Sequence, residues 1–254
     1  MERRESFSAA QVNRLKLRLE SASLEIHASN VEEIEALIQQ PDGTPDSEMS
    51  IRLENGQLTI EQHTPFKARL LRSSRRQLHV MLYLPTTWKG AAEASTVSGD
   101  LTAVGLDGAD LVLSTISGDM TVMHAWGISV KLQTVSGDVE ADTLSCEQLS
   151  LKSISGSLTM RGCDFNECSI HTTSGDCQVE AVETFDRLTA NSTSGNVSIA
   201  LPFDAADASL HTVSGRMRVT GVNLADGQPV IAMKTVSGNL YLTRYTPAQQ
   251  AGKI

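Results

Sequence analysis

Residues 96–122 read TVSGDLTAVGLDGADLVLSTISGDMTV, and the two copies of T-x-S-G-D in this stretch lie 19 residues apart. The corner motif, T/S-x-S-G, occurs eight times in the chain, with spacings of 19, 19, 19, 19, 20, 20 and 23 residues. Its glycines are Gly99, Gly118, Gly137, Gly156, Gly175, Gly195, Gly215 and Gly238. A fixed period of this kind is typical of repeat proteins, in which each unit packs only on its neighbours. The period therefore predicts a stacked molecule rather than one built around a single deep pocket.

Hydrophobic and polar residues alternate on both sides of the motif. The positions two and four residues after each glycine are apolar, as in Leu101 and Ala103, and the position between them is mostly polar. The positions seven and five residues before each glycine are apolar as well, as in Leu111 and Leu113. Period-two alternation is typical of half-buried strands. Each repeat therefore predicts two short strands, joined by the T-x-S-G corner and by a second, variable corner.

These patterns predict an all-β fold, a single-domain parallel β-helix with 19–20 residues and two main strands per coil. Like strands of successive coils should stack parallel at about 4.8 Å. Connections between parallel strands are nearly always right-handed, which favours a right-handed coil. Side-chain parity has to change at the corner, because the residues three before and two after the glycine both belong to inward columns. We expect the glycine to make this change through a left-handed or otherwise strained backbone.

The first 90 residues lack the motif but also carry β patterns. We expect strands at 15–19, 24–26, 49–53, 58–60 and 78–84, a strand rather than a short helix at 31–40, a turn at 54–57 and a loop at 40–46. We interpret residues 1–90 as degenerate coils that also cap one end, 91–243 as the regular solenoid with eight corners, and 244–254 as a C-terminal tail. All three parts are expected to form one structural domain, because terminal repeats are usually atypical.

Composition narrows the classes of function. The net charge of −9 comes entirely from residues 91–254, which carry 9 Lys/Arg and 18 Asp/Glu, so nucleic-acid binding there is disfavoured. No apolar run approaches the roughly 20 residues of a membrane span. The N-terminal residues 1–7 lack the apolar stretch of a secretory signal. We therefore expect no nucleic-acid partner, no membrane span and a cytoplasmic location.

The four cysteines lack a C-x-x-C spacing, which favours reduced thiols over disulfides. Cys163, Cys168 and Cys177 occupy apolar columns and are expected in the core. Cys146 lies in the variable corner, so we expect its thiol to be the one that is exposed.

The repeated T-[VI]-S-G-[DN] motif, its period and the segment Leu82-Tyr83-Leu84-Pro85 before the first repeat resemble one bacterial family. This is a β-strand-repeat family named "putative adhesin", a domain of unknown function, and the resemblance covers roughly residues 13–243. It implies a β-helix without established catalytic residues. Some members resemble cell-surface or envelope-stress proteins, so the resemblance also implies association with the cell envelope.

A row of carboxylates is the first candidate site. Stacked coils would place Asp100, Asp119 and Asp138 about 4.8 Å apart, and carboxylate oxygens suit Ca²⁺. The equivalent positions hold Asn196 and Asn239 in other coils, which favours a turn role in which the side chain accepts a hydrogen bond from a nearby backbone N–H. We favour the turn role and expect no metal or cofactor, with ion binding as the alternative.

A second candidate is the polar column four residues before each glycine. It includes His171 and His211, which two coils of separation would place too far apart to share a metal ion. We expect a solvated face that could still bind a glycan or another protein.

The only basic run spans residues 67–76. Its charged residues are Lys67, Arg69, Arg72, Arg75 and Arg76. We expect a solvated loop; the alternative is a partner surface for a phosphate-rich ligand, a membrane face or the acidic repeats of a second copy.

The chain lacks a P-loop, a G-x-S-x-G elbow, an H-E-x-x-H motif and a Rossmann fingerprint. Ser98 and its equivalents repeat eight times, which favours a turn role over a nucleophile. We therefore expect a non-catalytic scaffold or binding module for a protein or polymer partner. One alternative is a carbohydrate-active β-helix enzyme, with Asp138, Glu140, Asp142 and Arg161 as the nearest cluster. The other is a protein that self-assembles into homo-oligomers through its C-terminal coil.

Overall fold

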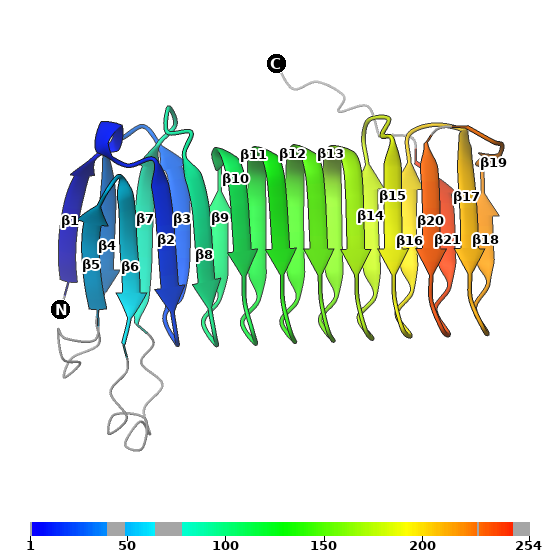
Figure 1. The fold of residues 1–254 in the computed structure, drawn as a ribbon, viewed down its shortest axis with the longest axis horizontal. Coiled ribbons are helices and arrows are strands. Elements are labelled where there is room, and N and C mark those ends of the chain that lie inside the picture. The colour runs from blue at the N-terminus through cyan, green and yellow to red at the C-terminus, as the bar shows by residue number, and fades with distance from the viewer. Residues whose placement is uncertain (1, 40–48, 64–77, 228, 246–254) are drawn as a thin grey trace, which may run out of the picture.

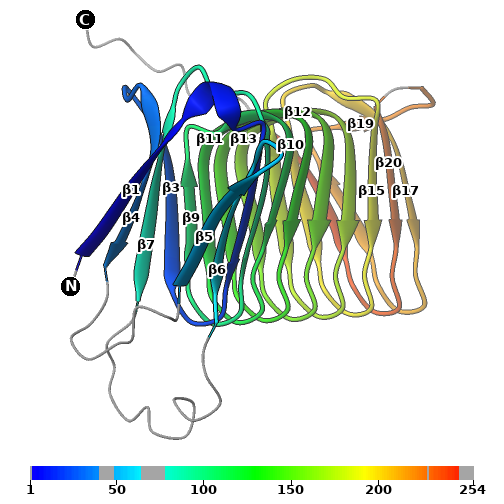
Figure 2. The ribbon, with the colours of Figure 1, turned by 60° about the vertical axis from the view of Figure 1, so that its left-hand side comes forward.

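The computed structural model describes residues 2–39, 49–63, 78–227 and 229–245, which form an elongated all-β stack (Figure 1). Twenty-one strands join one extended sheet that folds back on itself coil after coil (Figure 2). The other regular element in these ranges is a short 3-10 helix, Ala9–Gln11. The prediction of an all-β fold is confirmed.

The regular part of the stack consists of parallel strands whose paired residues are 19 or 20 positions apart. Leu111 pairs with Val130, for example, and Val130 with Leu149. Strands β11 to β13 run without a break over the upper corner, so each serves both faces of the stack. The strands are β8 (Ala91–Thr96), β9 (Leu101–Val104), β10 (Asp107–Ser114), β11 (Met120–Gln133), β12 (Val139–Lys152), β13 (Leu158–His171), β14 (Cys177–Ala181), β15 (Arg187–Asn191) and β16 (Val197–Leu201).

The core is a narrow column of aliphatic side chains between the two faces. The predicted inward positions are buried in every regular coil, from Leu101 and Leu111 to Val197 and Ile199. Aromatic rings fill the upper corner, where Phe185 lies 5.1 Å from Phe165 and 5.8 Å from Phe203 between ring centroids. The apolar positions predicted to point inward are therefore the ones that are buried in these coils.

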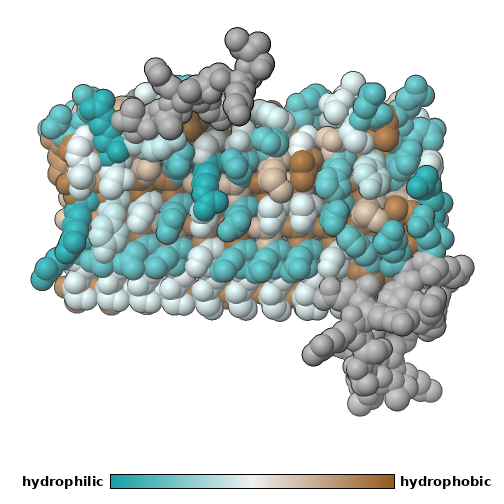
Figure 3. Space-filling model, turned by 180° about the vertical axis from the view of Figure 1, so that it is seen from behind, coloured by the Kyte–Doolittle hydropathy of each residue, from teal (hydrophilic) through white to brown (hydrophobic). Residues whose placement is uncertain are grey.

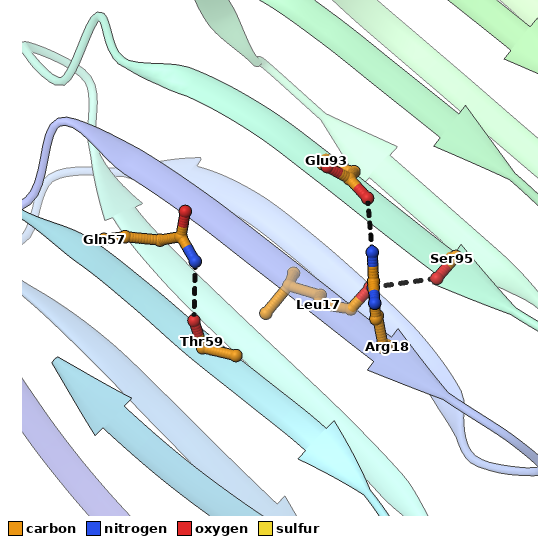
Figure 4. A network of polar contacts seen from close by, with 6 residues as sticks. All are labelled: Leu17, Arg18, Gln57, Thr59, Glu93 and Ser95. Carbon is orange, nitrogen blue, oxygen red and sulfur yellow. Dashed lines mark hydrogen bonds and ion pairs between the residues drawn. The ribbon is translucent and has the colours of Figure 1, made fainter. Parts of the chain in front are cut away.

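The coils nearest the N-terminus do not follow chain order. Strands β2 (Arg14–Leu19) and β3 (Ser23–Ser29) form one coil, and β6 (Gln57–Gln62) and β7 (His79–Pro85) form another. Strand β2 pairs with both β6 and β8, and β3 pairs with both β7 and β9, all in parallel. The coil that comes first in the chain therefore lies second in space. Figure 4 shows β2 with Leu17 and Arg18 between β6 and β8; Arg18 bonds Glu93 of β8 at 3.3 Å.

An antiparallel cap covers this end of the stack. It contains β1 (Glu2–Ser8), β4 (Glu33–Gln39) and β5 (Met49–Glu54), with β4 paired to both β1 and β7 and β5 paired to β6. The hairpin between β5 and β6 turns at Asn55 and Gly56, which both have positive φ, 50° and 79°. The turn expected at 54–57 and the strand expected at 31–40 are present. The loop expected at 40–46 lies outside the described residues.

At the C-terminal end, too, the order of the coils in space differs from their order in the chain. Its strands are β17 (Ala205–His211), β18 (Met217–Thr220), β19 (Asn223–Leu224), β20 (Val230–Lys234) and β21 (Leu240–Arg244). Strand β20 lies between β15 and β17, and β21 lies between β16 and β18. The expectation that successive coils stack in chain order is therefore wrong at both ends. In the described part of the chain, the coil of Gly215 closes the stack, and the coil of Gly238 lies inside it.

Candidate binding surface along the T-x-S-G edge

The eight motifs form the lower edge of the stack, and each turns the chain between its two faces. The threonine of the motif points inward and ties the corner together: Thr134 is buried, and its Oγ1 donates to the carbonyl oxygen of Gly137 at 2.9 Å. The same bond from residue three before the glycine is made in four other corners, by Thr96, Ser153, Thr172 and Ser192. A short β-hydroxyl at this position therefore satisfies a carbonyl that the turn takes out of the strand ladder.

The motif glycines act by close approach, which corrects the expectation that their backbone is left-handed. No motif glycine has a positive φ in the described chain. The parity change takes place earlier, because the consecutive residues Val97 and Ser98 are both exposed, between the buried Thr96 and Gly99. A Cβ atom on Gly137 would overlap the carbonyl oxygen of Gly118 in the neighbouring coil. Glycine is therefore needed because two main chains meet at the corner.

The motif serines join neighbouring coils. The hydroxyl of Ser117 donates to the carbonyl oxygen of Val97 at 3.2 Å, and its backbone N–H donates to the same oxygen at 2.9 Å. Ser136, Ser174 and Ser194 make the equivalent side-chain bond to the coil before their own. The hydroxyls thus have a main-chain acceptor, but it lies in the neighbouring coil and not in the serine's own turn, so the contact differs from the predicted turn role.

The carboxylate row is a second ladder between coils. Asp100 Oδ1 accepts from the backbone N–H of Asp119 at 3.0 Å, Asp119 from Asp138 at 2.9 Å, and Asp138 from the N–H of Ser157 at 2.8 Å. The side chain therefore accepts a backbone hydrogen bond, but from the next coil rather than from its own turn. Within the described residues, no group of three metal-ligating side chains is placed to hold an ion. Figure 3 shows a row of mostly hydrophilic side chains, with a paler interruption, along the lower part of this face.

A further ladder of the same kind begins at Asp176 and continues through amide side chains. Asn196 Nδ2 donates to Asp176 Oδ1 at 3.1 Å, and Asn239 Nδ2 donates to Asn196 Oδ1 at 2.9 Å. The step from Asn196 directly to Asn239 follows the exchanged order of the last two coils.

The residue two before each glycine forms an exposed row of β-branched side chains. Sequence alone left its direction open, and the structure turns it outward: Val97 is 44%, Ile116 46%, Val135 37% and Ile154 50% exposed. One residue per coil puts these side chains about 4.8 Å apart along the stack. We call Val97, Ile116, Val135 and Ile154 the apolar row. Large side chains exposed in register across four coils are unusual for a solvated edge and mark a candidate interaction surface.

A shallow groove of about 390 Å³ runs beside the apolar row. The polar column lines its other side, through Ser95, Ser114, Gln133 and Lys152, and the buried threonines lie at its base. The groove is thus apolar on one side and rich in hydrogen-bonding groups on the other, over four consecutive coils. The sequence predicted the polar column but not its pairing with an apolar neighbour.

Further along this column, His171 and His211 lie three coils apart, not two. His171 pairs in register with Asn191, Asn191 with Lys234, and Lys234 with His211. The prediction of two coils is wrong because β20 is inserted between β15 and β17. The greater separation strengthens the conclusion that the two rings do not share an ion.

The cysteines are all buried and free. Burial confirms the core positions predicted for Cys163, Cys168 and Cys177. The prediction that Cys146 is the exposed thiol is wrong, because β12 carries its side chain inward at the upper corner, where it is 8% exposed. Burial raises the pKa of Cys146 to about 12, and the carboxylate of Asp164 adds to this effect. Burial raises the pKa of Cys163, Cys168 and Cys177 as well, so we expect none of the four thiols to act as a nucleophile at neutral pH.

One cluster of titratable groups, on the outer face of β3 and β7, was not predicted from the sequence. Glu25 Oε2 lies 3.0 Å from His27 Nε2, and Glu25 Oε1 lies 3.0 Å from His79 Nε2. The hydrogen bond from His27 lowers the pKa of Glu25, against the opposing effect of desolvation. Tyr83 stacks on His27 with ring centroids 5.9 Å apart. The cluster brings together residues from two distant strands, which a sequence without visible repeats in this region does not reveal.

The basic run predicted as a partner surface, with Lys67, Arg69, Arg72, Arg75 and Arg76, lies outside the described residues. Over the part of the chain that is described, no helix has the length and apolar character to cross a membrane.

Comparisons with known proteins agree on the fold. A family model described as Toastrack DUF4097 matches residues 12–228. No curated protein matches the chain. A solved structure of a "putative lipid binding protein" from Parabacteroides distasonis is similar with a TM-score of 0.60 at 16% identity, over 94% of this chain and 96% of that one.

Two further similar structures are described as a "putative adhesin". One from Parabacteroides distasonis has a TM-score of 0.53 at 13% identity, and one from Bacteroides fragilis has 0.51 at 12%. Each comparison covers 96% of this chain and 97% of the other. At these identities the likeness shows a shared fold.

Proposed function

The chain belongs to the Toastrack DUF4097 family, and we propose that it is a non-catalytic binding module with an adhesin-like role. The observation that carries the proposal is the apolar row, which exposes one β-branched side chain per coil beside a groove with polar groups on its far side. The similar structures named as adhesins support a binding role for this fold. The finer description of the chain as a right-handed parallel β-helix is part of the same proposal.

We propose that the ligand is an extended polymer that lies along the stack. A surface that repeats every coil offers the same contacts several times, so it suits a ligand that also repeats. The apolar row would contact the ligand's nonpolar side, and Ser95, Ser114, Gln133 and Lys152 would bond its polar groups. Many weak contacts in a row add up to useful affinity without a deep pocket. A glycan chain of the cell envelope fits this chemistry.

The enzyme alternative gains no support from the residues proposed for it. Asp138 accepts a backbone hydrogen bond from Ser157 at the lower corner. Asp142 accepts a hydrogen bond from Thr143 Oγ1 at the upper end of the same strand segment, and it pairs in register with Arg161. These carboxylates are used in local structure, so we propose binding rather than turnover.

The cellular location remains a proposal as well. We propose association with the cell surface or envelope, which the names of the similar structures support, in place of the cytoplasmic location expected from the sequence. An epitope-tagged chain followed through cell fractionation distinguishes the two.

Binding to isolated bacterial envelopes and to a panel of purified envelope polysaccharides tests the proposed function. We expect the wild-type chain to be retained by at least one of them, and the double variant Ile116→Ser/Ile154→Ser to lose about tenfold in affinity, or about 1.4 kcal/mol. Ile128→Ser is the matched control, because Ile128 is as exposed, at 55%, but lies at the upper corner. Equal retention of the two variants, no retention of the wild type, or release of cleaved sugar would contradict the proposal.

A further inference from the structure

The coil of Gly215 leaves its core uncovered at the C-terminal end of the stack. Its inward residues Ala208, Leu210, Met217 and Val219 are only partly buried, and they pack on the core from one side. Their equivalents in the neighbouring coil, Ile231, Met233, Leu240 and Leu242, are at most 1% exposed. In Figure 3 this end lies at the left margin, where hydrophobic side chains reach the surface. Val213, at the lower corner of the same coil, is 84% exposed.

Both strands of this coil also present an unpaired edge. Within the described residues, Asp207–His211 of β17 pairs with β20 on one side, and Met217–Thr220 of β18 pairs with β21 on one side. Asp207 donates its N–H to Pro229, and the carbonyl of His211 accepts from Thr235. Because main-chain groups alternate in direction along a parallel ladder, those of Ala208 and Leu210 face away from β20. Strand β19 covers only Ala205 and Ala206, at the upper end of β17.

The opposite end is protected. There, β1, β4 and β5 close the stack with antiparallel pairing, and the outermost strand β1 begins Glu2-Arg3-Arg4-Glu5. Charged side chains on an edge strand discourage pairing with another chain. The two ends of the molecule therefore differ, because the antiparallel cap covers the N-terminal end, whereas the C-terminal end leaves its inward residues only partly buried.

Charge also favours contact at this end. Residues 91–204 carry four Lys/Arg and 16 Asp/Glu, whereas residues 205–222 carry Arg216, Arg218 and a single acidic residue, Asp207. Two copies packed side by side would bring their acidic coils together, and like charges at short range oppose association. Two copies that meet at their C-terminal ends bring together the least acidic coils of the repeat region.

We propose that the Gly215 coil is a docking surface for the same coil of a second copy, which gives a tail-to-tail dimer. A two-fold axis perpendicular to the stack aligns the two ends and makes both edge strands antiparallel to strands of the other copy. Both edges are then paired at once, because the second copy has its two faces at the same separation. Such a self-complementary interface closes after two copies. A single strand from another protein would pair only one of the two edges.

The docking surface differs from the one that the sequence predicts. The homo-oligomer was expected through the coil at the end of the sequence, but the residues of that coil, β20 and β21, lie inside the stack. The docking residues come from 205–220 instead. Their use does not depend on the apolar row, which lies on the lower edge of other coils.

Sedimentation velocity of the full chain over a range of concentrations tests the dimer. Ala208→Pro is the main variant, because proline removes an outward N–H from an edge strand and leaves the alternate bonds to β20 in place. We expect the wild-type chain to dimerise, and this variant to shift the dissociation midpoint by at least about tenfold, or about 1.4 kcal/mol. Val219→Lys, which places a charge on the uncovered core, should have the same effect. Circular dichroism of each monomer at low concentration checks that it remains folded.

Ile128→Ser, at the upper corner of an inner coil, is the control and should dimerise like the wild type. A wild-type chain that stays monomeric up to its solubility limit would overturn the proposal. So would an open series of larger species, which indicates head-to-tail stacking, or a dimer that both folded variants retain. Capture of an unrelated strand by a chain that does not dimerise would assign the edge to a different partner and would also overturn it.

Discussion

At the scale of single residues, the threonine, serine and glycine of the T-x-S-G motif and the Asp or Asn that follows it each have a distinct structural role. Threonine satisfies the carbonyl of its own corner, serine reaches the carbonyl of the neighbouring coil, and the Asp or Asn that follows accepts the next backbone N–H. Glycine allows the main chains of two coils to meet. The eightfold repetition of these residues is thus explained by equivalent contacts that recur from coil to coil.

The glycine assignment predicts a large penalty for a small change. In Gly137→Ala the new Cβ overlaps the backbone of Gly118, and neither coil can move without disturbing its other neighbour. We expect the free energy of unfolding to fall by about 1–3 kcal/mol, measured by denaturant titration. Ser136→Ala, at the adjacent position, loses an exposed 3.4 Å bond and should change it by less than about 0.5 kcal/mol. Equal stability of the glycine variant and the wild type would show that coils can separate at the corner.

At the scale of elements, the order of coils at the two ends is the main departure from a simple solenoid. Near the C-terminus, the chain runs from β16 to the outermost coil and then returns to fill the place between them. The N-terminal coils show the same interleaving, with β2 and β3 enclosed by strands from later in the chain. Interleaving holds β2, β3, β20 and β21 inside the stack, because each of these strands is paired on both sides and cannot fray without opening both of its neighbours.

Engineered disulfides test this order. Ala232 pairs in register with both Thr189 and Ser209, which lie on opposite sides of it. We expect oxidation to crosslink the variant Ser209→Cys/Ala232→Cys, because paired residues on neighbouring strands bring their Cβ atoms close enough for a disulfide. The variant Thr189→Cys/Ser209→Cys should stay reduced, because β20 separates the two strands. Mass spectrometry of the intact chain detects the crosslink. A crosslink in the second variant would indicate that β15 and β17 are neighbours and that the coils follow chain order.

The strands could be predicted from the sequence because a strand with one buried face requires an apolar residue at every second position. Sequence reasoning found the inward threonine and the buried Cys163 and Cys168 for that reason. It missed the exchanged coil order, because every coil carries the same pattern and any coil can pack on any other. It misplaced Cys146, because the long strand β12 continues through the upper corner and keeps its alternation there. The prediction that the motif glycines have a left-handed backbone was wrong. They are required by contact between neighbouring coils, which the local sequence does not reveal.

At the scale of the whole molecule, the stack separates its structural and functional surfaces. The core and the ladders between coils hold it together, the N-terminal end is capped, and the apolar row and the Gly215 coil remain available. We expect binding along one edge and self-association at one end. The two uses are compatible, because a tail-to-tail dimer leaves the groove beside Val97, Ile116 and Val135 open in both copies.

Hydroxyl-radical footprinting of the wild-type chain, with and without the envelope polysaccharide that retains it, tests the central claim most directly. We expect the ligand to reduce oxidation of Ile116, Val135 and Ile154 in the apolar row. Oxidation of Met123, Trp126 and Ile128 should stay unchanged, because these exposed side chains lie at the upper corner, on the opposite edge of the stack. Protection of the upper corner without protection of the apolar row would contradict the account.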